Sequence, residues 1–147
     1  MADVRVGPES WLPLTRGVRP LAVSYKGRSV TVDMPGWYRN GANESVHDKE
    51  DMRVSDRAVV TLKAEVHHLL TPDGVREIRT RLGLTQADAG RILGGGPNAF
   101  QKYESGEVMT SRAMTNLLLA LERHPEDLDR MREETSAAES GSAGVHA

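Results

Sequence analysis

The chain contains no cysteine. This absence excludes disulfide bonds, thiolate-bound zinc and cysteine nucleophiles together. Long hydrophobic runs are also missing, since no apolar stretch approaches the roughly 18 residues that span a bilayer, and the first residues lack the apolar segment of a signal peptide. We therefore expect a cytoplasmic protein that does not contact membranes.

Aromatic residues are scarce, at 4% of the 147 residues, whereas 38% of the residues are apolar and 27% are charged. A chain of this length fits one medium domain or two small ones. With so few large side chains, a small domain must be helical and build its core from Leu, Ile and Val. We predict a mainly α fold.

The net charge of −2 does not by itself indicate a nucleic-acid-binding protein. Phosphates respond to a local surface, however, and the charges are unevenly distributed. Six basic residues lie in the stretch 75–112, and six acidic residues lie in the stretch 122–134. A basic region followed by an acidic end is compatible with docking on DNA.

Apolar residues alternate on both sides of the turn pair Lys26-Gly27. With a two-residue loop, Tyr25 faces Arg28 and Val23 faces Val30, which puts the apolar side chains on one face of a hairpin. We expect this hairpin to end at Pro35-Gly36, and Trp37-Tyr38 is a candidate for a further short strand. A helix over about 48–70 follows, because apolar residues recur there at helical spacing. We assign residues 1–70 to a small α+β domain.

The next segment, residues 71–134, shows the signals of five short helices. Thr71-Pro72 and Thr85 are helix starts, and Gly83 and Gly94 are helix ends. The third of these helices is predicted over 97–105, and further helices follow around 114–121 and after residue 125. Residues 135–147 are rich in Ser, Ala and Gly, and we predict that they are disordered.

The second and third helices of this segment are joined by a tight glycine-rich turn. Two small residues, Ala89 and Gly90, allow a close helix crossing. Such a pair can lay its second helix in the major groove of DNA. If Phe100 and Tyr103 face the core, the opposite face of the helix presents three polar side chains, Asn98, Gln101 and Lys102. Asn and Gln can bind adenine in a bidentate way, and Lys can reach guanine.

Two motifs carry a resemblance to known families. Residues 82–86, Leu-Gly-Leu-Thr-Gln, and residues 103–106, Tyr-Glu-Ser-Gly, resemble the phage-repressor (Xre-type) helix-turn-helix family. Residues 93–104, Leu-Gly-Gly-Gly-Pro-Asn-Ala-Phe-Gln-Lys-Tyr-Glu, resemble the C-terminal half of MqsA-type antitoxins, and the likeness extends over about 70–131. It implies that Asn98 and Lys102 read an operator. The family more often has Arg at the second position, and Lys lacks the planar fork of Arg.

The repressor resemblance also implies a phosphate contact at Gln86 and a structural ion pair between Arg79 and Glu104. We expect further phosphate contacts from residues of the same region, namely Thr85, Arg112 and the backbone amide of Gly96.

The N-terminal half departs from the MqsA pattern, which includes a zinc domain with two Cys-x-x-Cys pairs. Residues 36–45 align with the second pair, but Arg39 and Ala42 replace the cysteines, and no first pair exists. A tetrahedral site needs four ligands, and His47, His67 and His68 do not make a set. We therefore expect no metal and no cofactor, and a zinc-free version of the toxin-binding half.

Three functions can be compared on this basis. The first is a homodimeric antitoxin that represses its own operon at a palindrome, with half-sites about 34 Å apart or a multiple of that, and blocks a ribonuclease-like toxin. The second is a free-standing transcriptional regulator without a toxin. The third, an enzyme, is disfavoured because the sequence has no clustered Ser/His/Asp set and no nucleotide motif.

Simpler readings exist for several of these residues. Asn98 and Lys102 could be ordinary exposed helix residues. The triple glycine lacks the Gly-Lys-Ser/Thr sequence of a phosphate loop. Trp11 and Trp37 could anchor a partner or only fill a small core.

Overall fold

The computed structural model describes residues 5–144, which form two compact units that divide between Lys63 and Ala64. Over these residues the structure has six helices and a four-stranded antiparallel sheet. The prediction of a mainly α protein with a smaller β part is therefore confirmed. Of the helices described, none is long and apolar enough to cross a membrane.

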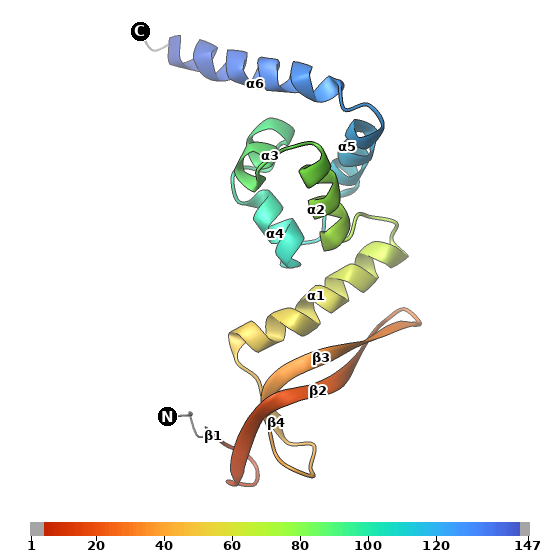
Figure 1. The fold of residues 1–147 in the computed structure, drawn as a ribbon, viewed down its shortest axis with the longest axis vertical. Coiled ribbons are helices and arrows are strands. Elements are labelled where there is room, and N and C mark those ends of the chain that lie inside the picture. Colours follow the sequence, from red (N-terminus) through yellow and green to blue (C-terminus); the bar gives the residue numbers. More distant parts are fainter. Residues whose placement is uncertain (1–4, 145–147) are drawn as a thin grey trace. The chain divides into compact units, whose positions relative to one another are not determined.

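The sheet of the first unit is built around one long hairpin (Figure 1). Its strands follow the order β1 (Arg5–Val6), β2 (Pro13–Tyr25), β3 (Arg28–Tyr38) and β4 (Ser45–Val46). Lys26 and Gly27 form the turn with φ angles of 43° and 80°. The predicted pairing of Tyr25 with Arg28 and of Val23 with Val30 is confirmed. A turn with two positive φ angles matches the twist of the flanking strands.

The hairpin does not end at Pro35-Gly36 as predicted, because β3 continues to Tyr38. Strand β4 pairs only with Trp37 and Tyr38. Pro35 therefore lies where the outer edge of β3 has no partner strand among the described residues, and an edge position tolerates a residue without an N–H group.

Helix α1 (Lys49–Val66) begins with a reciprocal cap. The Asp51 amide donates to the Asp48 carboxylate, and the Asp48 amide donates to the Asp51 carboxylate. This arrangement satisfies two backbone donors that the first turn leaves open. The helix ends four residues before the predicted end at 70, and His68 adopts a positive φ of 55°. The buried apolar side chains of this unit are Leu14, Val23, Met34, Tyr38 and Leu62.

The second unit contains five further helices. They are α2 (Pro72–Arg81), α3 (Gln86–Leu93), α4 (Ala99–Ser105), α5 (Arg112–Arg123) and α6 (Asp127–Gly144). The predicted caps are present: the Thr71 hydroxyl accepts from the Gly74 amide and the Thr85 hydroxyl accepts from the Asp88 amide. Phe100, Leu118, Leu121 and Val75 are almost fully buried and form the centre of the core.

The segment 135–147 was predicted to be disordered, but the structure continues α6 through Gly144. Alanine and glutamate favour helices, and Leu128 in the first turn of α6 is buried in the core. Farther along α6, Glu139 pairs with Arg91 of α3 at 3.0 Å. Residues 145–147 lie outside the described part of the chain.

Candidate nucleic-acid interface

The turn between α3 and α4 is built from three consecutive glycines. Gly94, Gly95 and Gly96 have φ angles of 113°, 95° and 89°, a region that side chains rarely allow. The amides of Gly94 and Gly96 both donate to the Gly90 carbonyl, at 3.1 and 3.3 Å. A Cβ atom on Gly90 would lie 1.8 Å from the Gly96 carbonyl oxygen. The close approach of the two segments therefore requires glycine at position 90.

Helix α4 has a buried face and an exposed face. Phe100 is fully buried, and the half-buried Tyr103 packs edge-on against it, with 5.4 Å between ring centroids. Asn98, Gln101 and Lys102 are exposed. The helix begins at Ala99 rather than at Pro97, and Asn98 is its N-cap residue. The Asn98 side chain makes no capping hydrogen bond, so its amide group faces solvent.

The exposed polar residues of α4 divide between two hollows. Asn98 and Lys102 line one of about 350 Å³, together with Pro97 and Tyr103. Gln101 lines another of about 380 Å³, together with Gln86, Arg76 and Ser105. The structure thus brings Asn98 and Lys102 together, and it groups Gln101 with Gln86. We did not single out Arg76 from the sequence, although it lies one helical turn before Arg79.

Arg79 and Glu104 form a two-bond ion pair between α2 and α4. The Arg79 Nε atom donates to Glu104 Oε2 at 2.7 Å and Nη2 donates to Oε1 at 2.9 Å. The third donor, Nη1, binds the Leu84 carbonyl at 2.7 Å. The hydrogen bonds to Glu104 raise the pKa of Arg79 above its ordinary value. Only 15% and 6% of the two side chains are exposed, so the pair fixes α4 against α2 and the segment before α3.

Three of the residues expected at phosphates already have other hydrogen bonds. Arg112 donates to the carbonyls of His67 and His68, which follow the end of α1, at 2.6 and 2.9 Å. The Gly96 amide donates within the α3–α4 turn. The Thr85 hydroxyl accepts the cap bond of α3 but keeps its own proton, and the residue is exposed. The geometry therefore favours Thr85 and Gln86 over Arg112 and Gly96 as phosphate contacts.

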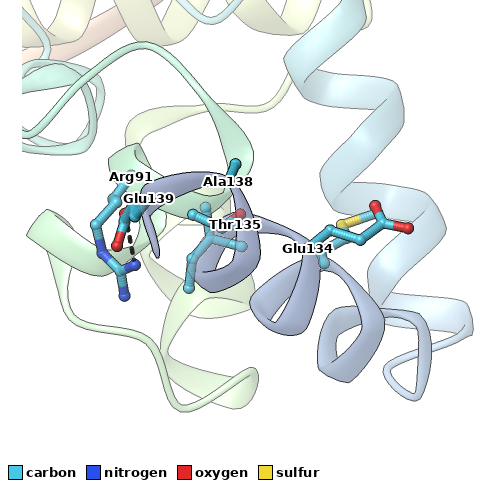
Figure 2. Close-up of a pocket in the computed structure, with 7 residues that line it drawn as sticks. Arg91, Glu134, Thr135, Ala138 and Glu139 are labelled. Carbon is cyan, nitrogen blue, oxygen red and sulfur yellow. Dashed lines mark hydrogen bonds and ion pairs between the residues drawn. The ribbon is translucent and has the colours of Figure 1, made fainter. Parts of the chain in front are cut away.

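Another hollow, of about 680 Å³, opens between α3 and α6. Figure 2 shows Arg91 of α3 and Glu139 of α6 joined by an ion pair in its lining, with Thr135 and Ala138 nearby. None of the residues predicted to contact DNA lines this hollow.

Two comparisons identify the relatives of the chain. Residues 10–132 match the family described as the antitoxin component of the bacterial toxin-antitoxin system, MqsA. The antitoxin MqsA of Escherichia coli (strain K12) is 31% identical over 121 residues, which are 81% of this chain and 92% of that protein. The family match includes the α3–α4 pair and most of the sheet unit. The chain belongs to the MqsA antitoxin family.

Proposed function

We propose that the chain is a DNA-binding antitoxin that represses its own operon and neutralises a partner toxin. One observation gives the main support for the DNA-binding part of this proposal. Asn98 and Lys102 are exposed at one hollow of α4, while Phe100 on the same helix is buried in the core. An amide and an ammonium group at the start of such a helix can reach base edges in the major groove.

The scaffold around α4 supports the same function. The glycine turn and the Arg79–Glu104 pair hold the short helix in one orientation, and a short helix is not stable alone. Recognition of bases requires such a fixed presentation. Two copies that pair through their C-terminal units would present two α4 helices to a palindromic operator, with half-sites about 34 Å apart or a multiple of that.

The sheet unit supports a protein partner. Several of its large apolar side chains are exposed: Trp11 by 79%, Val18 by 60%, Leu21 by 41% and Val30 by 40%. Leu21 and Val30 lie on the same face of the hairpin, since Leu21 pairs with Val32 and Val23 pairs with Val30. Neighbouring exposed apolar groups of this kind mark interaction surfaces. We assign to this unit the binding of a toxin, ribonuclease-like by analogy with the family.

The experiment has two arms. In the first, the purified chain is titrated against DNA from upstream of its own gene and against a scrambled fragment of equal length. We expect binding to the upstream DNA at concentrations at least 10-fold lower, and equal binding would contradict the operator. In the second, the chain is co-expressed with the product of the adjacent gene, and we expect a complex and relief of growth arrest.

A free-standing regulator is the second candidate, and it is favoured by the replacement of two family cysteines by Arg39 and Ala42 in the sheet unit. If the adjacent gene, expressed alone, neither slows growth nor yields a protein that binds the chain, this candidate replaces the antitoxin.

A further inference from the structure

The zinc site implied by the MqsA resemblance does not fit the residues of the sheet unit. The chain has no cysteine, and residues 39 and 42 are Arg and Ala. Among residues 5–144 there is no group of three or more His, Asp or Glu side chains that could hold a metal ion. Structural zinc needs four such ligands. The loop 39–44 must therefore be held to the rest of the unit by other groups.

Arg19 of β2 binds this loop at the two positions that align with the cysteines. Its Nη1 atom donates to the Ala42 carbonyl and its Nη2 atom donates to the Arg39 carbonyl, both at 2.6 Å. The guanidinium carbon also lies 4.6 Å from the centroid of the Tyr38 ring. A planar fork with several donors can bind two carbonyls at once, which the single ammonium of Lys does less well.

Glu44 binds the same loop to the N-terminal turn of residues 7–12. Its carboxylate accepts from the amides of Glu9 and Ser10 at 2.9 and 3.2 Å, and from the Ser10 hydroxyl. Only 7% of the Glu44 side chain is exposed. These hydrogen bonds hold the pKa of Glu44 below its usual value, and the bond from the Ser10 hydroxyl has the largest effect.

Gly7 leaves the space for this carboxylate. A Cβ atom on Gly7 would lie 2.1 Å from the Glu44 carboxylate oxygen. The carboxylate thus lies directly against the backbone of the turn. Together the two side chains bind the loop 39–44 to two segments that are distant from it in the sequence, the N-terminal turn and strand β2.

We propose that Arg19 and Glu44 form a polar cross-link that replaces the zinc cross-link of the family and makes the fold of the sheet unit independent of metal. A metal ion stabilises a small unit by joining distant segments. Here a buried carboxylate and a guanidinium join such segments through five hydrogen bonds.

Tryptophan fluorescence of the full chain can test this proposal selectively. Both tryptophans, Trp11 and Trp37, lie in the sheet unit, whereas most helical circular dichroism comes from the second unit. The variants are Arg19→Met, Arg19→Lys and Glu44→Gln. The control is Arg53→Met, which removes an arginine that is 61% exposed and pairs with the exposed Glu50 of the same helix.

We expect the wild-type fluorescence midpoint to be the same with EDTA, with added zinc and with neither. Arg19→Met and Glu44→Gln should lower it by about 4–8 °C or more, Arg19→Lys should lower it less, and Arg53→Met should leave it unchanged. Loss of the fluorescence transition in Arg19→Met, with the helical transition intact, also supports the cross-link.

Two results would overturn the proposal. One is a wild-type midpoint that falls in EDTA and recovers with zinc. The other is that the Arg19 and Glu44 variants have the same fluorescence midpoint as the Arg53→Met control.

Discussion

The Asn98 side chain, at the N-cap of α4, lacks the hydrogen bond that an asparagine in this position usually makes. Asparagine at the N-cap normally bonds the backbone of its own helix, but here no such bond is made and the residue is exposed. Its donor and acceptor groups therefore remain for another molecule. Lys102, one turn later, adds a charge at the same hollow.

Asn98→Ala should weaken binding to the operator by about 1–3 kcal/mol and leave binding to scrambled DNA nearly unchanged. The side chain stabilises nothing in the helix, so the melting temperature should stay the same. Fluorescence anisotropy with both DNA fragments measures the difference. Asn40→Ala, at an exposed position in the sheet unit, is the control and should bind like the wild type.

Phe100→Ala should behave in the opposite way, because this side chain is 0% exposed. Removal of a buried aromatic ring costs about 3–5 kcal/mol of unfolding free energy. Urea unfolding followed by helical circular dichroism measures this loss. If Phe100→Ala and Asn98→Ala melt alike, the two faces of α4 are assigned wrongly.

Among the elements, the α3–α4 turn depends most strictly on its sequence. Gly90→Ala would drive a Cβ atom into the Gly96 carbonyl, and because both groups belong to the backbone the turn itself must shift. We expect loss of stability and of operator binding together. Gly141→Ala is the matched control, since a Cβ there meets nothing within 4 Å and alanine favours the helix. A Gly90→Ala protein with full operator affinity would contradict the close crossing.

The link between α2 and α4 gives a second test at this scale. Glu104→Gln keeps the shape of the side chain but removes the negative charge beside the largely buried guanidinium of Arg79. We expect a loss of about 3 kcal/mol, the low end for a broken buried pair. Glu77→Gln breaks an exposed pair with Arg81 and should cost less than about 1 kcal/mol. Equal losses in chemical unfolding would show that the buried pair contributes no more than a surface one.

The sequence predicts the parts of these elements that depend on neighbouring residues. Alternation around Lys26-Gly27 gives the register of the hairpin, and Thr71 and Thr85 mark helix starts, because both signals are local. The exposure of Asn98 and Lys102 follows from the spacing of Phe100 and Tyr103.

The remaining features depend on distant partners. Strands β1 and β4 have two residues each and exist through pairing with β2 and β3. The length of α6 could not be predicted, since its composition resembles a disordered tail and its contact with Arg91 is 48 residues away in the chain. The partners of Arg112 depend on the folding of residues 67–68 beside α5. No local pattern reports such contacts.

For the molecule as a whole, we expect acid to destabilise the sheet unit through two of its carboxyl groups. In the sheet unit, Arg16 donates two hydrogen bonds to Asp51, a side chain only 2% exposed. These bonds hold the pKa of Asp51 well below its ordinary value, and the pKa of Glu44 is also lowered. A carboxyl group with a lowered folded-state pKa contributes stability above its unfolded pKa of about 4, and that contribution is lost as the pH falls further.

The fluorescence midpoint of the sheet unit should therefore fall as the pH is lowered from about 5 to about 3. Asp51→Asn should have a lower midpoint at neutral pH and a weaker dependence on pH. Asp33→Asn, which changes an exposed carboxyl group of β3, should keep the wild-type slope. Thermal melts across this range provide the comparison, and identical slopes for wild type and Asp51→Asn would exclude this source of acid sensitivity.

The residues just after α1 are bound into the second unit by side chains of α5 and of the loop before it. The Leu70 amide donates to the Thr115 hydroxyl, and the Thr110 hydroxyl donates to the Leu70 carbonyl. Arg112 donates to the carbonyls of His67 and His68. A fragment that begins at Thr71 would lack these backbone partners. The buried hydroxyl groups of Thr110 and Thr115 would then keep their mutual hydrogen bond but lose those to Leu70. Excision at Ala64 would retain them, so we expect a stable C-terminal fragment to begin inside α1 instead of after it.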